Sequence, residues 1–97
     1  MFRVLVIDDN PEVRELLQSI LEGAGYAVDL ASDGALGLIL QRARPADVVI
    51  TDSFMPGRDG IETAARLRSE FPQLKIVALP QPLDPDRLLR ALRETLR

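Results

Sequence analysis

Short apolar runs alternate with amphipathic stretches along the chain, which is the pattern of strands alternating with helices. Apolar runs rich in Val, Ile and Leu predict buried strands over residues 4–7 and 47–51. Two further strands are predicted over residues 26–31 and 75–79. Apolar residues at helical spacing predict helices that start at Pro11, cover 35–43 and 60–70, and start again at Pro85.

The residues that flank the first and last predicted helices support their boundaries. Asn10 is a favourable N-cap, Pro11 suits the first helical position, and Gly25 provides a stop. Asp84 and Pro85 repeat the same start signal for the last helix. We therefore expect helices to begin at these two points.

Strands that alternate with helices predict right-handed βαβ units on a parallel sheet, hence an α/β fold. A chain of 97 residues is long enough for one compact core and too short for two. Prolines and glycines are dispersed between the apolar runs, and no stretch has the composition of a linker. We expect a single domain over residues 1–97.

Acidic residues follow two of the predicted strands. Asp8 and Asp9 come directly after the first strand, and Asp52 comes after the third. Ligands of open parallel sheets bind beyond the carboxyl ends of the strands, where the strand order reverses. One such acid is most often a solvated loop residue or a helix cap, whereas two clusters that converge on one edge favour a functional site.

The composition narrows the chemistry that this site can perform. The chain has no Cys and no His, which excludes thiolate catalysis, cysteine zinc sites and the usual general base. A net charge of −3 gives no reason to expect a nucleic-acid partner, and we interpret the arginines of the last helix as a solvated face. No apolar run is long enough for a membrane span or a signal peptide, so we expect a cytoplasmic protein without a membrane partner.

Three carboxylates held close together repel one another and need a cation. Mg²⁺ suits such a site, because it binds through one or two carboxylates, keeps several waters and accepts phosphate oxygens. A free carboxylate beside it can attack phosphorus and form an acyl phosphate. The acids therefore predict Mg²⁺-dependent phosphoryl chemistry.

Three segments together resemble the receiver domains of bacterial two-component response regulators, and the resemblance covers residues 1–79 and resumes over 82–97. These segments are Val4-Leu5-Val6-Ile7-Asp8-Asp9-Asn10-Pro11, the Asp33-Gly34 turn, and Thr51-Asp52-Ser53-Phe54-Met55-Pro56-Gly57-Arg58-Asp59-Gly60. The resemblance implies a flavodoxin-like three-layer fold, with Asp52 as the phosphoacceptor. It also implies Mg²⁺ on Asp8, Asp9, Asp52 and the backbone carbonyl of Phe54, and a histidine kinase or phosphotransfer protein as the donor.

The chain departs from the family pattern after the fourth strand. The family has a Thr or Ser there, then a helix, then a fifth strand that ends in a Lys before Pro, whereas here Leu79 runs directly into Pro80-Gln81-Pro82. A parallel crossover needs about a dozen residues, so we expect an atypical sheet of four strands in the order 2-1-3-4. Gln81 then takes the place of the Lys.

Two residues are candidates for contacts with the phosphate. Gln81 can donate a hydrogen bond without neutralising charge, and Arg58 follows Asp52 as a possible cationic substitute, although exposure to solvent is the commoner state of an arginine. Lys75 starts its strand, about 13 Å from the carboxyl edge by the rise per residue. Leu38 and Phe54 are expected as single exposed apolar side chains.

Three hypotheses for function follow. The first is a stand-alone, shortened receiver that is not an enzyme and accepts phosphate at Asp52. The alternative is a pseudo-receiver, a protein–protein interaction module independent of phosphorylation, which the missing Lys and hydroxyl support. The third is a phosphatase of the haloacid-dehalogenase type, against which Phe54 stands where a second Asp is needed.

The missing unit also predicts a homodimer. Without a fifth strand, the strand over 75–79 lies at the edge of the sheet, and its apolar residues make that edge prone to association with another chain. Two copies can pair edge to edge about a two-fold axis, or exchange the last helix over 84–97 across the hinge at 80–83. We expect a homodimer built on the fourth strand and the last helix.

Overall fold

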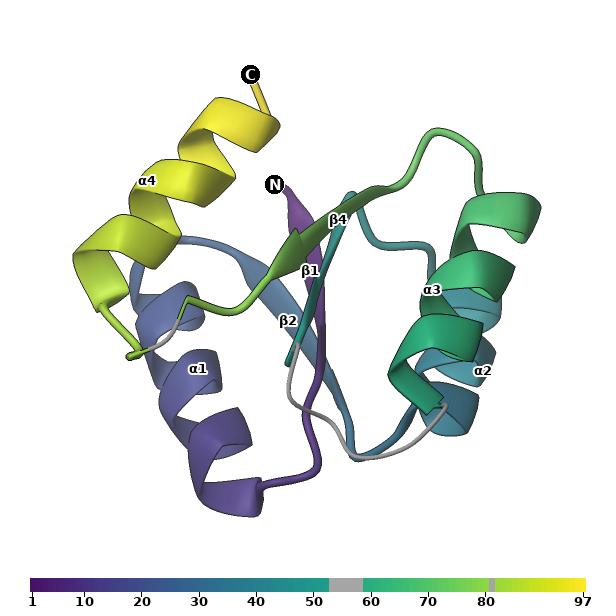
Figure 1. Cartoon of the computed structure of the whole chain (residues 1–97). Coiled ribbons are helices and arrows are strands. Elements are labelled where there is room, and N and C mark those ends of the chain that lie inside the picture. Colours follow the sequence, from purple (N-terminus) through teal and green to yellow (C-terminus); the bar gives the residue numbers. More distant parts are fainter. Residues whose placement is uncertain (53–58, 81) are drawn as a thin grey trace.

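A computed structural model of the chain describes residues 1–52, 59–80 and 82–97. Strands and helices alternate, as the hydrophobic pattern predicts (Figure 1). In chain order the elements are β1 (Arg3–Ile7), α1 (Pro11–Gly23), β2 (Ala27–Ala31), α2 (Gly34–Ala43), β3 (Val48–Thr51), α3 (Asp59–Glu70), β4 (Lys75–Ala78) and α4 (Pro85–Thr95). Every predicted element is present, with boundaries that differ from the predictions by one or two residues.

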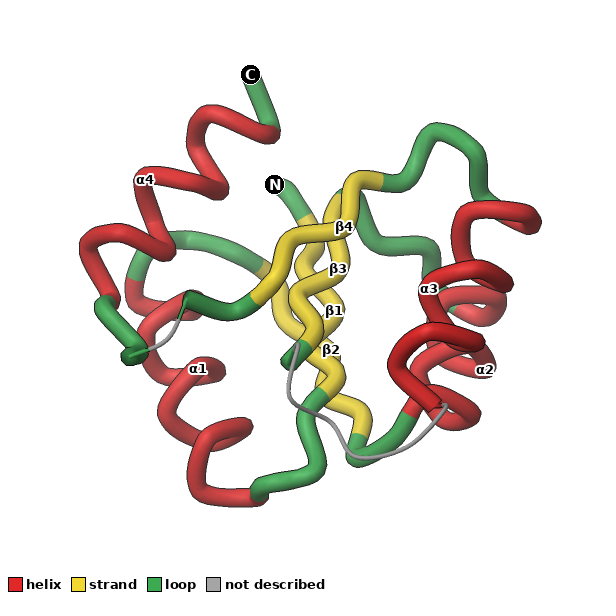
Figure 2. Tube along the Cα trace, in the orientation of Figure 1, coloured by secondary structure: helices red, strands yellow, loops and turns green. Residues whose placement is uncertain are grey.

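The four strands form one parallel sheet in the order β2-β1-β3-β4, which confirms the predicted order. Helices α1 and α4 lie on one side of the sheet, and α2 and α3 lie on the other (Figure 2). The molecule therefore has the three layers of a flavodoxin-like fold. No helix among the described residues is long and apolar enough to cross a membrane.

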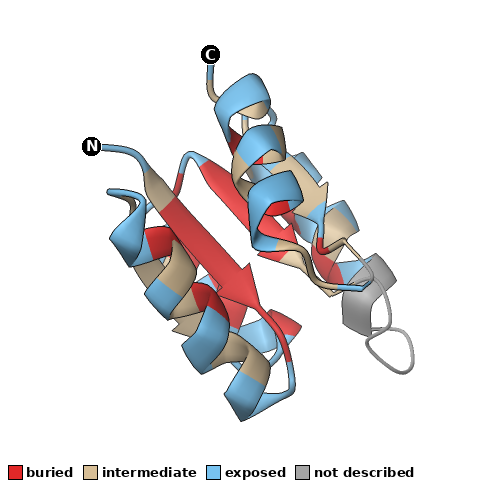
Figure 3. Cartoon of the chain, turned by 90° about the vertical axis from the view of Figure 1, so that its left-hand side faces the viewer, coloured by how far each residue is buried: buried red, intermediate tan, exposed pale blue. Residues whose placement is uncertain are grey.

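Each face of the sheet has its own apolar core. Beneath α1 and α4, the alternate residues Val4 and Val6 of β1 pack with Leu88 and Leu92 of α4. Beneath α2 and α3, the intervening residues Leu5 and Ile7 of β1 pack with a second set of buried residues, which comprises Ala31, Leu38, Ala46, Val49 and Leu67. Because residues 4–7 of β1 are buried on both faces (Figure 3), this part of the strand is apolar without interruption.

The α2 prediction needs one correction. Leu38 was expected to be exposed, but only 5% of it is accessible, because it faces the sheet beside Leu5 and Ile7. Leu36 and Ile39 are the exposed apolar residues of this helix, at 38% and 58%. The helix is apolar on nearly all sides, so periodicity alone could not identify its inner face. Phe54, the other residue of that prediction, lies outside the described residues.

The caps predicted for α1 and α4 are confirmed. The Asn10 side chain accepts hydrogen bonds from the backbone N–H groups of Glu12 at 2.9 Å and Val13 at 3.4 Å. The Asp84 side chain accepts in the same way from Asp86 and Arg87. Each cap satisfies N–H groups that have no partner within the helix, and so fixes where the helix begins.

Candidate acidic site at the carboxyl edge of the sheet

The backbones of the two predicted acidic clusters are held by hydrogen bonds that extend the sheet ladders. Asp8 follows β1 and donates its backbone N–H to the carbonyl oxygen of Ala31, at the end of β2, over 3.0 Å. Asp52 follows β3 and donates its backbone N–H to the carbonyl oxygen of Ile7, at the end of β1, over 3.3 Å. The acids are therefore fixed to three neighbouring strands rather than carried on a free loop.

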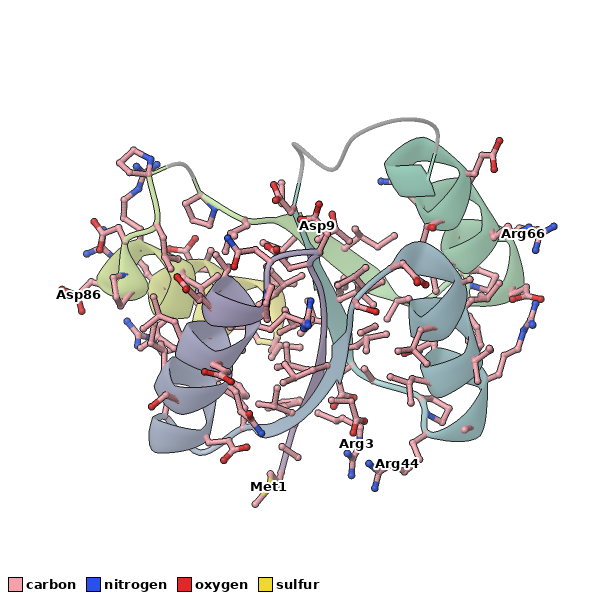
Figure 4. The ribbon with its side chains drawn as sticks, turned by 90° about the horizontal axis from the view of Figure 1, so that it is seen from below. Met1, Arg3, Asp9, Arg44, Arg66 and Asp86 are labelled. Atoms are coloured by element: carbon pink, nitrogen blue, oxygen red, sulfur yellow. The ribbon has the colours of Figure 1, made fainter. Side chains whose placement is uncertain are left out.

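The structure brings the three predicted carboxylates together. Each of Asp8, Asp9 and Asp52 offers a carboxylate oxygen, and these oxygens lie within 4.8 Å of one another. Asp8 is buried, with 1% of its surface accessible, while Asp52 is half-buried and Asp9 is exposed. Figure 4 shows Asp9 on the side of the molecule opposite to Arg3 and Arg44. The site therefore opens to solvent on the side of Asp9.

Burial raises the pKa of the Asp8 carboxyl above its ordinary value, because the charged form loses hydration. The negative charges of Asp52 and Asp9 also raise this pKa. Two neighbours act in the opposite direction: the backbone N–H of Asn10 donates to Asp8 Oδ1 at 2.8 Å, and Arg14 contributes a positive charge. The balance is a raised pKa, with burial as its largest cause.

This arrangement fits a hard divalent cation. Three carboxylates supply oxygen ligands and an excess of negative charge, and the exposure of Asp9 leaves space for water and for a further oxygen ligand. Mg²⁺ prefers this combination, because it is reluctant to give up its waters and is seldom enclosed entirely by protein groups. The acidic cluster is therefore compatible with Mg²⁺ binding.

Arg14 is a residue of the site that the sequence analysis missed. Its Nη1 donates a hydrogen bond to the backbone carbonyl oxygen of Asp8 over 2.6 Å. Side chains on a helix lean toward its N-terminus, and the N-terminus of α1 lies at the carboxyl edge of the sheet. A long basic side chain in the first turns of a helix that follows an acid pair was the signal available in the sequence.

The remaining predicted site residues divide into two groups. Phe54, Arg58 and Gln81 lie outside the described residues, so their roles stay predictions. Lys75 is the first residue of β4 and pairs with Val48 at the start of β3. Its position at the amino end of the strands agrees with its exclusion from the site.

Comparison with known proteins identifies the family. The profile described as "Response regulator receiver domain" matches residues 4–96. The chain belongs to the response regulator receiver family. Receiver domains of this family are parts of two-component signalling systems and partner with histidine kinases.

Individual relatives agree with this assignment. Response regulator MprA from Mycobacterium sp. (strain KMS) is 43% identical over 77 residues, which are 79% of this chain and 34% of MprA. The chain thus spans about a third of the length of this curated relative. Response regulator TrrA from Thermotoga maritima, solved in complex with Mg²⁺–BeF, is 29% identical with a TM-score of 0.88, and the match covers 98% of this chain and 99% of TrrA.

A second structure shows TrrA together with histidine kinase ThkA. The matched chain of this complex is 31% identical with a TM-score of 0.85, and the match covers the whole of this chain and of the matched chain. The receiver fold of the present chain is therefore established by both sequence and structure.

Proposed function

We propose that this receiver domain accepts a phosphoryl group on Asp52 while Asp8, Asp9 and Asp52 hold Mg²⁺. The observation that carries the proposal is the meeting of three carboxylates, with oxygens within 4.8 Å, at the carboxyl edge of a receiver sheet. The Mg²⁺–BeF complex of the similar protein TrrA supports it. A phosphoacceptor of this kind takes part in signalling and is not itself an enzyme.

The chemistry needs no general base. A carboxylate oxygen of Asp52 attacks phosphorus, a new O–P bond forms, and the bond between phosphorus and the donor atom breaks. A bound Mg²⁺ would neutralise the carboxylates and the phosphoryl oxygens during this displacement. The chain's own contribution is to hold Asp52 in position, through its backbone hydrogen bond to Ile7, and to keep Asp8 and Asp9 beside it.

The test is phosphorylation by acetyl phosphate with Mg²⁺, followed by intact mass measurement. The wild type should gain the mass of one phosphoryl group, and Asp52→Asn should gain none. Asp86→Asn is the matched control, because Asp86 is an exposed acid on α4 and lies away from Asp9 (Figure 4). An absent adduct on the wild type, under conditions that label another receiver, would overturn the proposal.

For the donor, we propose a histidine kinase or a phosphotransfer protein of a two-component system. The complex of TrrA with histidine kinase ThkA supports this class of partner. In such a transfer the P–N bond of phosphohistidine breaks as the O–P bond to Asp52 forms. A cytoplasmic location would suit such a partner and stays a prediction.

The second candidate function is a pseudo-receiver that signals by binding alone. The position of Lys75 favours it, since the sole lysine of the chain stands at the amino end of β4, away from the acids. A receiver without a cation to meet the phosphoryl group would form little acyl phosphate. The phosphorylation experiment above separates the two functions directly.

We further propose a homodimer that uses β4 and α4. Among the described strands, β4 pairs only with β3, and its residues Ile76 and Val77 are half-buried while Lys75 and Ala78 are exposed. An edge of this kind offers free backbone groups to another strand, and a second copy supplies an identical edge about a two-fold axis.

A further inference from the structure

Arg14 brings a positive charge into direct contact with the acidic site. Its guanidinium donates from Nη1 to the carbonyl oxygen of Asp8 at 2.6 Å, a short distance for a charge-assisted hydrogen bond. The side chain is half-buried, so solvent screens its charge less than that of an exposed arginine. The contact holds the guanidinium at the carboxyl edge of the sheet.

The charge of Arg14 reaches the carboxylates themselves. The carbonyl oxygen that Arg14 contacts belongs to Asp8 itself, whose carboxylate is buried, so the two charges are held close together where solvent screens them little. Asp52 and Asp9 each offer an oxygen within 4.8 Å of an oxygen of Asp8, so a charge held at Asp8 also acts on the other two carboxylates. The amino-terminal turn of α1 adds a favourable dipole from the same direction.

We propose that Arg14 is the resident counter-charge of this pocket, which offsets the negative charge that a phosphoryl group adds at Asp52. The role rests on the proposed phosphoacceptor function and deepens it. Counted over the described residues, the three carboxylates carry three negative charges, which the two charges of a bound Mg²⁺ and the one of Arg14 would balance. When the Asp52 carboxylate becomes an acyl phosphate dianion, one further negative charge appears, and without Arg14 the imbalance would double.

Arg14 holds the backbone of Asp8 by a hydrogen bond, and its charge acts on the other carboxylates without contact. Its observed contact is to the Asp8 backbone, not to Asp52. A guanidinium is charged at every physiological pH and carries five N–H donors, so one donor can hold Asp8 while the charge serves the rest of the pocket. The sole lysine of the chain cannot share the role, because it lies at the other end of the strands.

A counter-charge predicts two effects of opposite sign when the charge is removed. In Arg14→Gln, Mg²⁺ should bind more tightly by roughly three- to tenfold, because a competing cation is gone. The phosphorylated fraction reached with acetyl phosphate at saturating Mg²⁺ should fall by a similar factor, roughly three- to tenfold, as should the affinity for beryllofluoride. Arg14→Lys keeps the charge and should stay close to the wild type in both measurements.

The experiment combines Mg²⁺ titration by calorimetry with intact mass measurement of the adduct, for the wild type, Arg14→Gln, Arg14→Lys and Arg66→Gln. Arg66 is the matched control, since it is an exposed arginine on α3, far from Asp9 (Figure 4). If Arg14 only fixed the loop after β1, loosening that loop would weaken Mg²⁺ and phosphoryl binding together. A parallel loss, or no change in either, would therefore overturn the inference.

Failure of the inference and failure of the proposed function are distinguishable. A wild type that gains no phosphoryl group overturns the phosphoacceptor function, and the role of Arg14 with it. A wild type that is labelled normally, beside an Arg14→Gln variant that is labelled equally well, overturns only the role of Arg14.

Discussion

Asp8 is the residue at which stability and function conflict. It is buried beside two other carboxylates, and burial raises its pKa above the ordinary value of 3.8. The folded protein therefore holds a proton on Asp8 more tightly than the unfolded chain does. Stability from this group is fully present below the unfolded pKa and is lost as the pH rises through the raised folded pKa. At neutral pH without a cation, the charge of Asp8 destabilises the fold.

Asp8→Asn should therefore stabilise the metal-free protein at pH 7. The amide oxygen of Asn can still accept the Asn10 N–H that Asp8 Oδ1 accepts now. We expect the melting temperature in the presence of a chelator to rise by roughly a few degrees at pH 7. At pH 3 the difference should vanish. Thermal melts followed by circular dichroism across this pH range provide the measurement, and a variant less stable at pH 7 would contradict the argument.

Asp9 provides the contrasting case, because it is exposed and has little hydration to lose. Asp9→Asn should change the melting temperature of the metal-free protein less than Asp8→Asn does, because it removes a repulsive charge but no buried one. Millimolar Mg²⁺ should raise the melting temperature of the wild type by mass action, and this rise should disappear in the variant. An equal Mg²⁺ response in both proteins would place the cation elsewhere on the chain.

At the scale of elements, α2 approaches its neighbours closely because it carries glycine at two inward positions. A Cβ on Gly34 would lie 1.7 Å from Thr63 Oγ1 and 2.8 Å from Thr63 Cβ, on α3. A Cβ on Gly37 would lie 2.5 Å from Ile7 Cδ1, on β1. Arg42 and Glu70 join the other ends of α2 and α3 by an ion pair of 2.6 Å. The missing side chains at Gly34 and Gly37 therefore set the spacing of this layer.

Gly34→Ala should destabilise the protein by roughly 1–3 kcal/mol, as expected for overpacking at a tight contact. Gly23→Ala is the matched control, because a Cβ there meets nothing within 4 Å, and it should be neutral or stabilise by about 0.5–1 kcal/mol. Urea unfolding gives both values. A Gly34→Ala variant as stable as the wild type would show that α3 can move away without cost.

At the scale of the whole molecule, the outer edge of β4 decides the state of association. Leu79 donates its backbone N–H to the carbonyl oxygen of Thr51 on β3. Backbone groups of successive residues in a strand point to opposite sides, so those of Ala78 point away from β3. The side chain of Ala78 is exposed, which makes this residue the place to block the edge without removing core contacts.

Ala78→Pro should convert the proposed homodimer to a monomer, because proline removes the outward N–H and is tolerated at a strand edge. Ile39→Lys serves as the control, because it changes an exposed apolar residue of α2 and should leave the dimer intact. Sedimentation equilibrium of the three proteins gives the answer. A wild type that stays monomeric at high micromolar concentration would rule out the dimer.

The elements and the three acids of the site could be predicted from local sequence signals and the family resemblance. Short, largely apolar runs identified the strands, and the caps Asn10 and Asp84 identified the helix starts, because both signals are local. Asp8, Asp9 and Asp52 could be assigned to one site, since the carboxyl ends of parallel strands share an edge. The order of the strands followed from the family resemblance rather than from any local signal.

Which helix faces are buried, and which distant groups meet, depends on packing across the molecule. Leu38 is buried and Ile39 is exposed, although both are apolar neighbours on a helix without a polar face. Arg14 donates a hydrogen bond to the carbonyl oxygen of Asp8. The spacing of the two residues does not predict this contact, because an arginine side chain has many rotamers and only packing selects one. Local patterns specify what each segment forms, whereas contacts across the molecule depend on how the segments pack.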